Sequence, residues 1–188
     1  MVLRLVSHDG TNRLTRERVQ ALTACVEQLA TNAPARLIIA GNTKFFSAGA
    51  NLHEIAALTG TAACDFAQMG QRLMHAVANF PAPAIAVVEW YCMGGGLDLA
   101  LACHVRIAAP HAIFGHRGAA LGLITGWGGT QRLPRLIGKA RALEMFLTAA
   151  KLDARHASAV GLISSIAGNP MAAALAFTSP GPTIPAQS

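Results

Sequence analysis

The sequence predicts an α/β fold with a mostly parallel β-sheet. Two short runs, Leu37–Ala40 and Ala84–Val88, are wholly apolar, which is typical of strands buried on both faces of a parallel sheet. Longer segments between such runs carry apolar residues at helical spacing, for example Val19, Leu22 and Val26. Strands that alternate with helices along a chain are characteristic of the α/β class.

The other elements follow in chain order. Thr15 can cap a helix whose first turn contains Glu17, and the apolar spacing of this helix continues to about Ala30. Pro81 and Pro83 end a second amphipathic helix. We expect further strands at residues 2–7, 105–108, 113–114 and 162–166, further helices at residues 97–103, 128–136 and 140–149, and a loop over residues 41–50.

The composition indicates one domain with a large apolar core. Of the 188 residues, 53% are hydrophobic and 13% are charged, and the mean hydropathy is +0.41. Such values suggest either a large core or faces that other subunits cover. We expect the core over residues 1–166, and over residues 167–188 a short helix and a Pro-rich, disordered tail. No apolar stretch reaches the length of a membrane span, and the N-terminal segment is unlike a secretory signal.

The charges and the cysteines argue against nucleic-acid and metal binding. The net charge is +6, but the basic residues are scattered along the chain. Nucleic acid is therefore a weak candidate ligand. The positive net charge suits a phosphate-rich small molecule as well as it suits nucleic acid. The four cysteines form no Cys-X-X-Cys pair and have no histidine at metal-ligand spacing. We therefore expect no metal site, buried free thiols and a reduced, cytoplasmic setting.

Two loops carry the strongest chemical signal, the segments FSAGANL at residues 46–52 and GGGLDLA at residues 94–100. Their small residues let a ligand approach backbone N–H groups closely, and the second loop opens a helix whose first N–H groups are unpaired. N–H groups from two such loops can hold one developing oxyanion. Each loop alone is also typical of a tight turn that packs a helix on a sheet, and the glycines lack the G-x-G-x-x-G spacing of a dinucleotide site.

These two segments and a third resemble the signature of the enoyl-CoA hydratase/isomerase, or crotonase, family. FSAGANL resembles the family's FSAGADL, GGGLDLA resembles GGGxELA, and GWGGTQRLPRLIG at residues 126–138 resembles GxGGTQRLPRLIG. The motifs come in the family's order and spacing, and the resemblance covers residues 14–165. It implies a crotonase-like spiral of ββα units. Because family members continue well beyond this length, it also implies a fold truncated at the C-terminus.

The resemblance also implies a site for an acyl-CoA thioester, with coenzyme A as part of the substrate and no separate cofactor. The backbone N–H groups of Ala50 and Gly95 would form the oxyanion hole, and Asp98 would stand for the first of two catalytic glutamates. The second glutamate falls at Gly118, which cannot transfer a proton, although His116 lies nearby and can act as an acid or a base. The other implied substrate-binding residues are Ala48, Asn51, Leu52, Gly94, Gly118 and Trp127.

Structural roles remain open for several of these side chains. An acidic residue such as Asp98 in the first turn of a helix complements the helix dipole without any catalysis. His116 can equally be a surface or hydrogen-bonded structural residue. Trp127 can belong to the core or shape the acyl pocket.

The leading hypothesis is that the protein is an acyl-CoA enzyme that stabilises an enolate, most simply an enoyl-CoA hydratase or isomerase. With one carboxylate, isomerisation is more natural than addition of water. The resemblance further implies a homo-oligomer, a trimer or a hexamer. The alternative is a non-catalytic acyl-CoA-binding or scaffold protein on the same fold. RNA binding, which some relatives show, conflicts with the scattered charge. A serine protease on a related fold would need a Ser/His/Asp set, and no sequence pattern suggests that Ser47 is activated.

Overall fold

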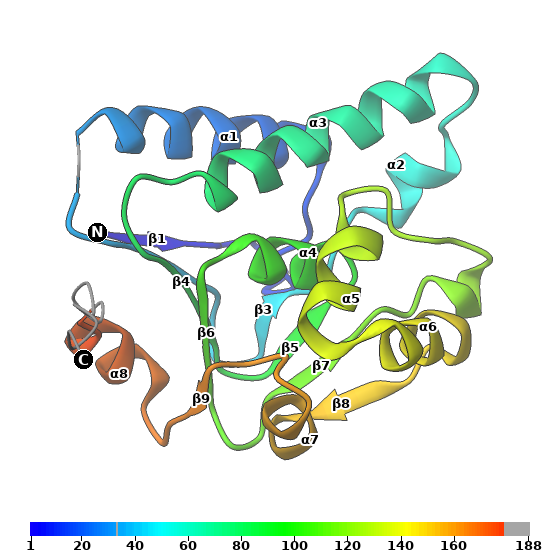
Figure 1. Cartoon of the computed structure of the whole chain (residues 1–188). Helices are drawn as coiled ribbons and strands as arrows, with labels where there is room; N and C mark the ends of the chain where they lie inside the picture. Colours follow the sequence, from blue (N-terminus) through cyan, green and yellow to red (C-terminus); the bar gives the residue numbers. More distant parts are fainter. Residues whose placement is uncertain (33, 179–188) are drawn as a thin grey trace, which may run out of the picture.

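Two β-sheets form the framework of the chain (Figure 1). The computed structural model describes residues 1–32 and 34–178. In the first sheet all neighbouring strands are parallel, in the order β1 (Val2–Arg4), β2 (Leu37–Ala40), β4 (Ala84–Val88), β6 (Val105–Ala108) and β9 (Ser165–Ile166). In the second sheet, where only the last pair is antiparallel, the order is β3 (Phe45–Ser47), β5 (Tyr91–Met93), β7 (Ile113–Gly115) and β8 (Lys151–Asp153).

Helices follow the strands in a repeated ββα order. The strand pairs β2–β3, β4–β5 and β6–β7 each contribute one strand to each sheet, and each pair is followed by helical structure. The helices are α1 (Arg16–Thr31), α2 (Leu52–Ala56), α3 (Thr61–Ala78), α4 (Gly95–Ala102), the 3-10 turn η1 (Ala119–Leu121), α5 (Gly129–Ile137), α6 (Lys139–Thr148), α7 (Ala154–Ala159) and α8 (Pro170–Ala176). The predicted α/β class with a mostly parallel sheet is confirmed.

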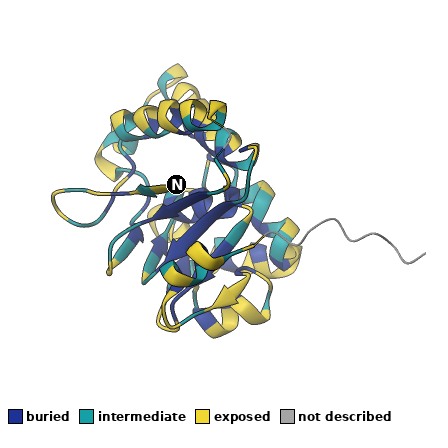
Figure 2. Cartoon of the chain, turned by 90° about the vertical axis from the view of Figure 1, so that its left-hand side faces the viewer, coloured by how far each residue is buried: buried dark blue, intermediate teal, exposed yellow. Residues whose placement is uncertain are grey.

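The central strands β2 and β4 of the first sheet are buried on both faces because helices cover each side. Leu37 and Ile39 of β2 belong to the main core, on the side of α1 and α3. The alternate residues Ile38 and Ala40 pack on the opposite face with Ala174 of α8. Successive side chains of a strand point to opposite faces, so a strand covered on both sides has to be apolar throughout. Figure 2 shows these strands as the buried centre of the molecule, with exposed residues on the outer sides of the helices.

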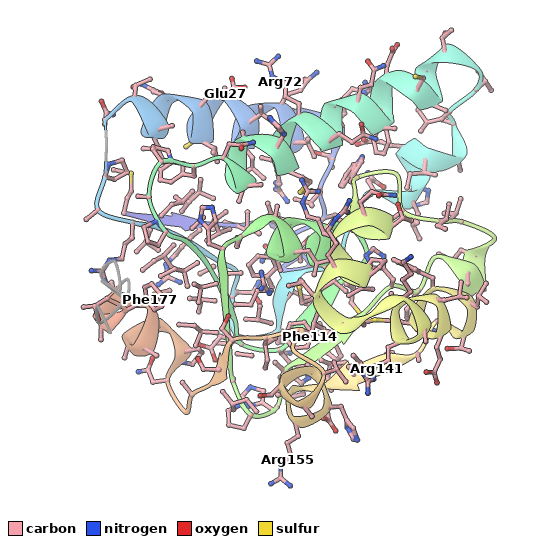
Figure 3. The ribbon with its side chains drawn as sticks, in the orientation of Figure 1. Glu27, Arg72, Phe114, Arg141, Arg155 and Phe177 are labelled. Atoms are coloured by element: carbon pink, nitrogen blue, oxygen red, sulfur yellow. The ribbon has the colours of Figure 1, made fainter. Side chains whose placement is uncertain are left out.

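Helices α1 and α3 lie side by side and close the top of the main core (Figure 1). Thr15 caps α1 as predicted, since its side chain accepts a hydrogen bond from the N–H of Arg18 at 3.2 Å. Glu27 of α1 and Arg72 of α3 form a two-bond ion pair, with a shortest N···O distance of 3.0 Å. Figure 3 shows this pair on the outer surface. Because both side chains are largely exposed, the ion pair contributes little to stability; the apolar faces beneath it hold the helices.

Several short elements differ from the sequence-based expectation. The predicted loop 41–50 contains β3, and the sequence did not indicate β5, β8 or α7. Strand β1 ends at Arg4 instead of residue 7, and α4 begins at Gly95 instead of residue 97. The missed strands have three residues each, too few to show a period, and their hydrogen-bond partners lie far away in the sequence.

The four cysteines are free thiols, but the expectation that they are buried is wrong for Cys25 and Cys64, which are exposed on α1 and α3. Cys92 and Cys103 are buried, and burial raises the pKa of Cys103 to about 12 and the pKa of Cys92 well above its ordinary value. Within residues 1–32 and 34–178, no helix is both long and apolar enough to cross a membrane. The predicted domain boundary at residue 166 stays a prediction, and the tail predicted to be disordered lies, from residue 179 onward, outside the described residues.

Candidate active site

The two glycine-rich loops meet where β3 and β5 end. Gly94 turns the chain from β5 into α4 with φ +51°, and Gly49 has φ +96°, a backbone conformation that favours glycine. A Cβ atom on Gly49 would lie 3.0 Å from the backbone nitrogen of Gly95. A Cβ atom on Gly95 would lie 3.3 Å from the backbone nitrogen of Ala50. The absence of side chains at both glycines thus allows the two loops to come into direct contact.

The N–H groups of Ala50 and Gly95 border a cavity of about 410 Å³. Within the described part of the chain neither N–H group donates a hydrogen bond to a protein acceptor. Gly95 is the first residue of α4, so the positive end of the helix dipole points to the same place. Two unpaired donors that share one cavity wall are a suitable pair of ligands for a single oxygen that gains negative charge.

Most of the residues predicted to bind substrate line this cavity, and one does not. Asn51 is absent from the lining: its side chain accepts a hydrogen bond from the N–H of His53 at 3.1 Å and caps α2. The other predicted residues in the lining are Ala48, Leu52, Gly94, Asp98, Gly118 and Trp127. Ser47 lies outside the lining, and its hydroxyl donates a hydrogen bond to the carbonyl of Asn12 at 2.7 Å, which is a structural role.

Asp98 holds a buried hydrogen-bond network at the wall of the cavity. Its side chain is 1% exposed. Its Oδ1 atom lies 2.9 Å from Nε2 of His116, which is 4% exposed, and its Oδ2 atom accepts a hydrogen bond from the hydroxyl of Thr125. Each oxygen of the carboxylate therefore has a partner, as a buried charge requires.

Helix α5 begins directly against this carboxylate. A Cβ atom on Gly129, the first residue of α5, would lie 2.1 Å from Oδ1 of Asp98 and 3.0 Å from Nε2 of His116. The N-terminal end of a helix carries partial positive charge, which stabilises a carboxylate beside it. Burial lowers the pKa of Arg132 on the same helix, while the charge of Asp98 acts in the opposite direction. Asp98 therefore lies in a positive environment provided by α5.

The backbone around Gly118 leaves no room for a longer side chain. A Cβ atom at this position would lie 2.5 Å from the carbonyl oxygen of Leu123. The carbonyl of Gly118 in turn accepts hydrogen bonds from the N–H groups of Leu121 and Leu123, each at 2.8 Å. The loop thus closes tightly on Gly118, and a glutamate here would require the backbone to move.

Trp127 is both a core residue and a wall of the cavity. Its indole is 3% exposed, packs on Phe66 with ring centroids 5.2 Å apart, and donates a hydrogen bond to the Phe66 carbonyl at 3.1 Å. A Cβ atom on Gly95 would lie 2.6 Å from the six-membered part of the indole. The indole therefore covers the outer side of the loop that presents the Gly95 N–H group.

The pairing of Asp98 with His116 and Thr125 was not predicted. His116 was considered because it lies near Gly118 in the sequence, and Thr125 was not considered. The sheet register explains why these residues meet: β5 and β7 are parallel, and Met93 pairs with Gly115. Residues that follow parallel neighbouring strands meet at one edge of the sheet, which brings His116 next to the helix that follows β5. No group of three or more potential metal ligands occurs within the residues that the structure describes.

Comparison with known proteins identifies the family of this chain. The sequence profile of the enoyl-CoA hydratase/isomerase family matches residues 1–172, and the chain belongs to this family. A probable enoyl-CoA hydratase of Bacillus subtilis is 42% identical over 161 residues, which are 85% of this chain and 62% of that protein. The mitochondrial methylglutaconyl-CoA hydratase of Homo sapiens is 39% identical over 159 residues, 84% of this chain and 47% of that protein.

Solved structures give the same result. Pseudomonas aeruginosa DspI superposes with a TM-score of 0.87 at 34% identity, and the superposition covers 93% of this chain and 72% of the DspI chain. The enoyl-CoA hydratase from Bacillus anthracis superposes with a TM-score of 0.83 at 34% identity, and the superposition covers 88% of this chain and 65% of the hydratase chain. The predicted crotonase-like fold is thereby confirmed. The chain spans 62% of the length of the Bacillus subtilis relative and about half of the human one.

Proposed function

We propose that this protein acts on an acyl-CoA thioester and stabilises its enolate between the N–H groups of Ala50 and Gly95, most simply as an enoyl-CoA hydratase or isomerase. One observation carries the proposal: two unpaired backbone donors from separate loops meet at a cavity whose wall also contains the buried carboxylate of Asp98. This set provides the oxyanion ligands and the basic group that enolate chemistry requires.

In the proposed reaction the carbonyl oxygen of the thioester accepts hydrogen bonds from both N–H groups. Removal of a proton next to the carbonyl moves negative charge onto this oxygen, where the donors already point. Because they are held in place by the loops, they need no reorganisation as the charge develops. Loss of one such donor typically costs about 3–4 kcal/mol of transition-state stabilisation. Asp98 supplies the basic function, either directly or through a hydrogen-bonded partner.

The acyl group would occupy the apolar part of the cavity. Leu52, Ile55, Phe66 and Trp127 contribute to its walls, so a hydrocarbon chain loses contact with water there. Coenzyme A enters this proposal only as part of the substrate, and no separate cofactor or metal takes part in any step. A cytoplasmic setting stays a prediction.

Turnover of a short trans-2-enoyl-CoA and of its 3-enoyl isomer by the purified protein tests the proposal. Hydration removes the conjugated enoyl absorbance of the first compound, and isomerisation creates it from the second. Asp98→Asn is expected to lower kcat about 10²–10⁴-fold, while binding of an unreactive acyl-CoA, measured by calorimetry, stays within a few-fold. If the wild-type protein binds several acyl-CoA classes and converts none, the non-catalytic binding or scaffold role replaces this proposal.

We also propose that copies of this chain associate, as a trimer or a hexamer. Large apolar side chains that remain exposed support this: Leu121 and Ile124 at the cavity and Leu143 and Leu147 on α6, which packs against η1. Exposed apolar groups on neighbouring elements favour burial by another subunit. Sedimentation equilibrium at micromolar concentration is expected to show a closed oligomer, and a monomer would contradict the proposal.

A further inference from the structure

We infer that His116 is the residue that exchanges a proton with the substrate, and that Asp98 is a positioning residue that acts through it. This inference rests on the proposed function and assigns the proton-transfer step within it. The sequence offers no second carboxylate at Gly118, and the backbone there has no space for one. The structure instead places an imidazole at the cavity wall, in contact with the carboxylate that the family motif provides.

The hydrogen bonds of Asp98 leave the carboxylate without a free oxygen. Oδ1 lies 2.9 Å from Nε2 of His116, and Oδ2 accepts the hydroxyl proton of Thr125. A Cβ atom at Gly129 would lie 2.1 Å from Oδ1, so α5 closes that side as well. Because Asp98 is only 1% exposed, direct removal of a substrate proton by Asp98 would require the carboxylate to move out of this network. Proton transfer through His116 requires no such rearrangement.

The other nitrogen of His116 is the free edge of this pair. Nδ1 makes no hydrogen bond to the described residues, yet no buried side-chain nitrogen or oxygen atom among those residues lacks a partner. Nδ1 must therefore retain accessible surface, although the residue as a whole is only 4% exposed. The ring lines the cavity and packs against Phe146 of α6, with ring centroids 5.3 Å apart. This packing limits rotation of the ring, and we infer that the accessible surface of Nδ1 faces the cavity that the ring lines.

The pair has the composition of a general base and the group that orients it. With its proton on Nε2, His116 donates to Asp98 and presents the lone pair of Nδ1, as in hydrolases where a carboxylate fixes the tautomer of a catalytic histidine. The carboxylate also stabilises the imidazolium that forms when Nδ1 accepts a proton. Thr125 fixes the second carboxylate oxygen, and therefore the direction of the first.

The resulting step is balanced without any further reactant. In a 3-enoyl thioester, Nδ1 of His116 removes a proton from C2, and the C–H electrons form a C1–C2 double bond. The carbonyl π electrons move onto the thioester oxygen, which becomes the oxyanion held by the N–H groups of Ala50 and Gly95, and the product is a dienolate that keeps its C3–C4 double bond. The carbonyl then re-forms, the C1–C2 electrons become the C2–C3 double bond of the 2-enoyl thioester, and the C3–C4 electrons take the proton that the imidazolium returns to C4. One basic group serves both halves of the reaction, so no second carboxylate is needed.

His116→Gln separates this role from a structural one. The glutamine side-chain nitrogen reaches about as far as Nε2 and can donate the same hydrogen bond to Asp98, but an amide does not accept a proton at neutral pH. The first readout is exchange of the C2 protons of butyryl-CoA for deuterium in D2O, followed by NMR, because this exchange needs only enolate formation. We expect a loss of exchange and of isomerase turnover of about 10²–10⁴-fold, with butyryl-CoA binding retained.

His116→Ala with added imidazole provides the second variant. The alanine leaves a space beside the cavity in which imidazole can take the place of the ring, and we expect a saturable recovery of exchange. Thiazole, which has a similar shape and is a far weaker base, should not restore it. A purely structural histidine would give no difference between these two compounds.

The outcomes distinguish this inference from the proposed function. If wild-type protein exchanges the C2 protons and His116→Gln does so at the wild-type rate, the inference is overturned while the enolate function stands. If His116→Gln does not fold, lack of recovery in His116→Ala with imidazole overturns the inference instead. If wild-type protein shows neither exchange nor turnover but binds the thioester, both the proposed function and the inference fail.

Discussion

Gly129→Ala is expected to lower kcat/KM for the enoyl-CoA reaction about 100-fold or more, although the change adds only one methyl group. The new Cβ would lie 2.1 Å from Oδ1 of Asp98, 2.8 Å from Cγ2 of Thr125 and 3.0 Å from Nε2 of His116. Atoms cannot remain at these distances, so the carboxylate must move and lose a hydrogen bond. A displacement of about 1 Å in a catalytic group can cost about 10²-fold in rate.

The backbone at this position can accept the same change, and the stability cost comes from the hydrogen bond that Asp98 loses. Gly129 is the first residue of α5 and its φ lies outside the left-handed region, so alanine can adopt the same backbone conformation. The measurement is steady-state turnover together with urea unfolding of each variant. Gly168→Ala is the matched control, because a Cβ atom there meets nothing within 4 Å. Wild-type turnover by Gly129→Ala would mean that the position of Asp98 has no importance for the reaction.

Trp127→Ala is expected to lower the free energy of unfolding by about 3–5 kcal/mol, the usual range when a buried tryptophan becomes alanine. The indole is 3% exposed and fills the space between Phe66, Gly70 and Gly95. Its removal leaves a cavity and also leaves the Phe66 carbonyl without the 3.1 Å hydrogen bond. A loss of this size is a large part of the stability of an ordinary domain.

Two further variants separate burial from the hydrogen bond. Trp90, the other tryptophan of the chain, is 38% exposed, and Trp90→Ala is expected to cost about 1 kcal/mol or less. Trp127→Phe keeps most of the ring volume and should fall between the two alanine variants. Urea unfolding followed by circular dichroism gives all three values. If Trp127→Ala and Trp90→Ala destabilise equally, Trp127 is not the core residue that its burial indicates.

The sequence predicted the parts of the fold that local patterns encode. The runs at Leu37–Ala40 and Ala84–Val88 became strands with the expected bounds, because strands covered on both faces must be apolar at every position. Thr15 capped α1, because capping depends on neighbours three residues away. The short strands β3, β5 and β8 were not predicted, because they form only through pairing with strands that are distant in the sequence.

The candidate site divides in the same way. The motif at residues 94–100 supplied Gly95 and Asp98, and the structure places both at the cavity together with Ala50. The sequence could not show that Asn51 caps α2, because its motif is equally suited to a substrate contact.

The amino-acid sequence by itself determined the class of the fold, the two loops that present backbone donors and the carboxylate beside them, since each depends on residues close together in the chain. Only the tertiary structure decided the partners of that carboxylate. Asp98 meets His116, 18 residues away, and Thr125, 27 residues away. These contacts arise because β5 and β7 are parallel neighbours and the N-terminal end of α5 packs against Asp98. Such proximity arises from the packing of distant segments, and local periodicity or motifs in the sequence do not encode it.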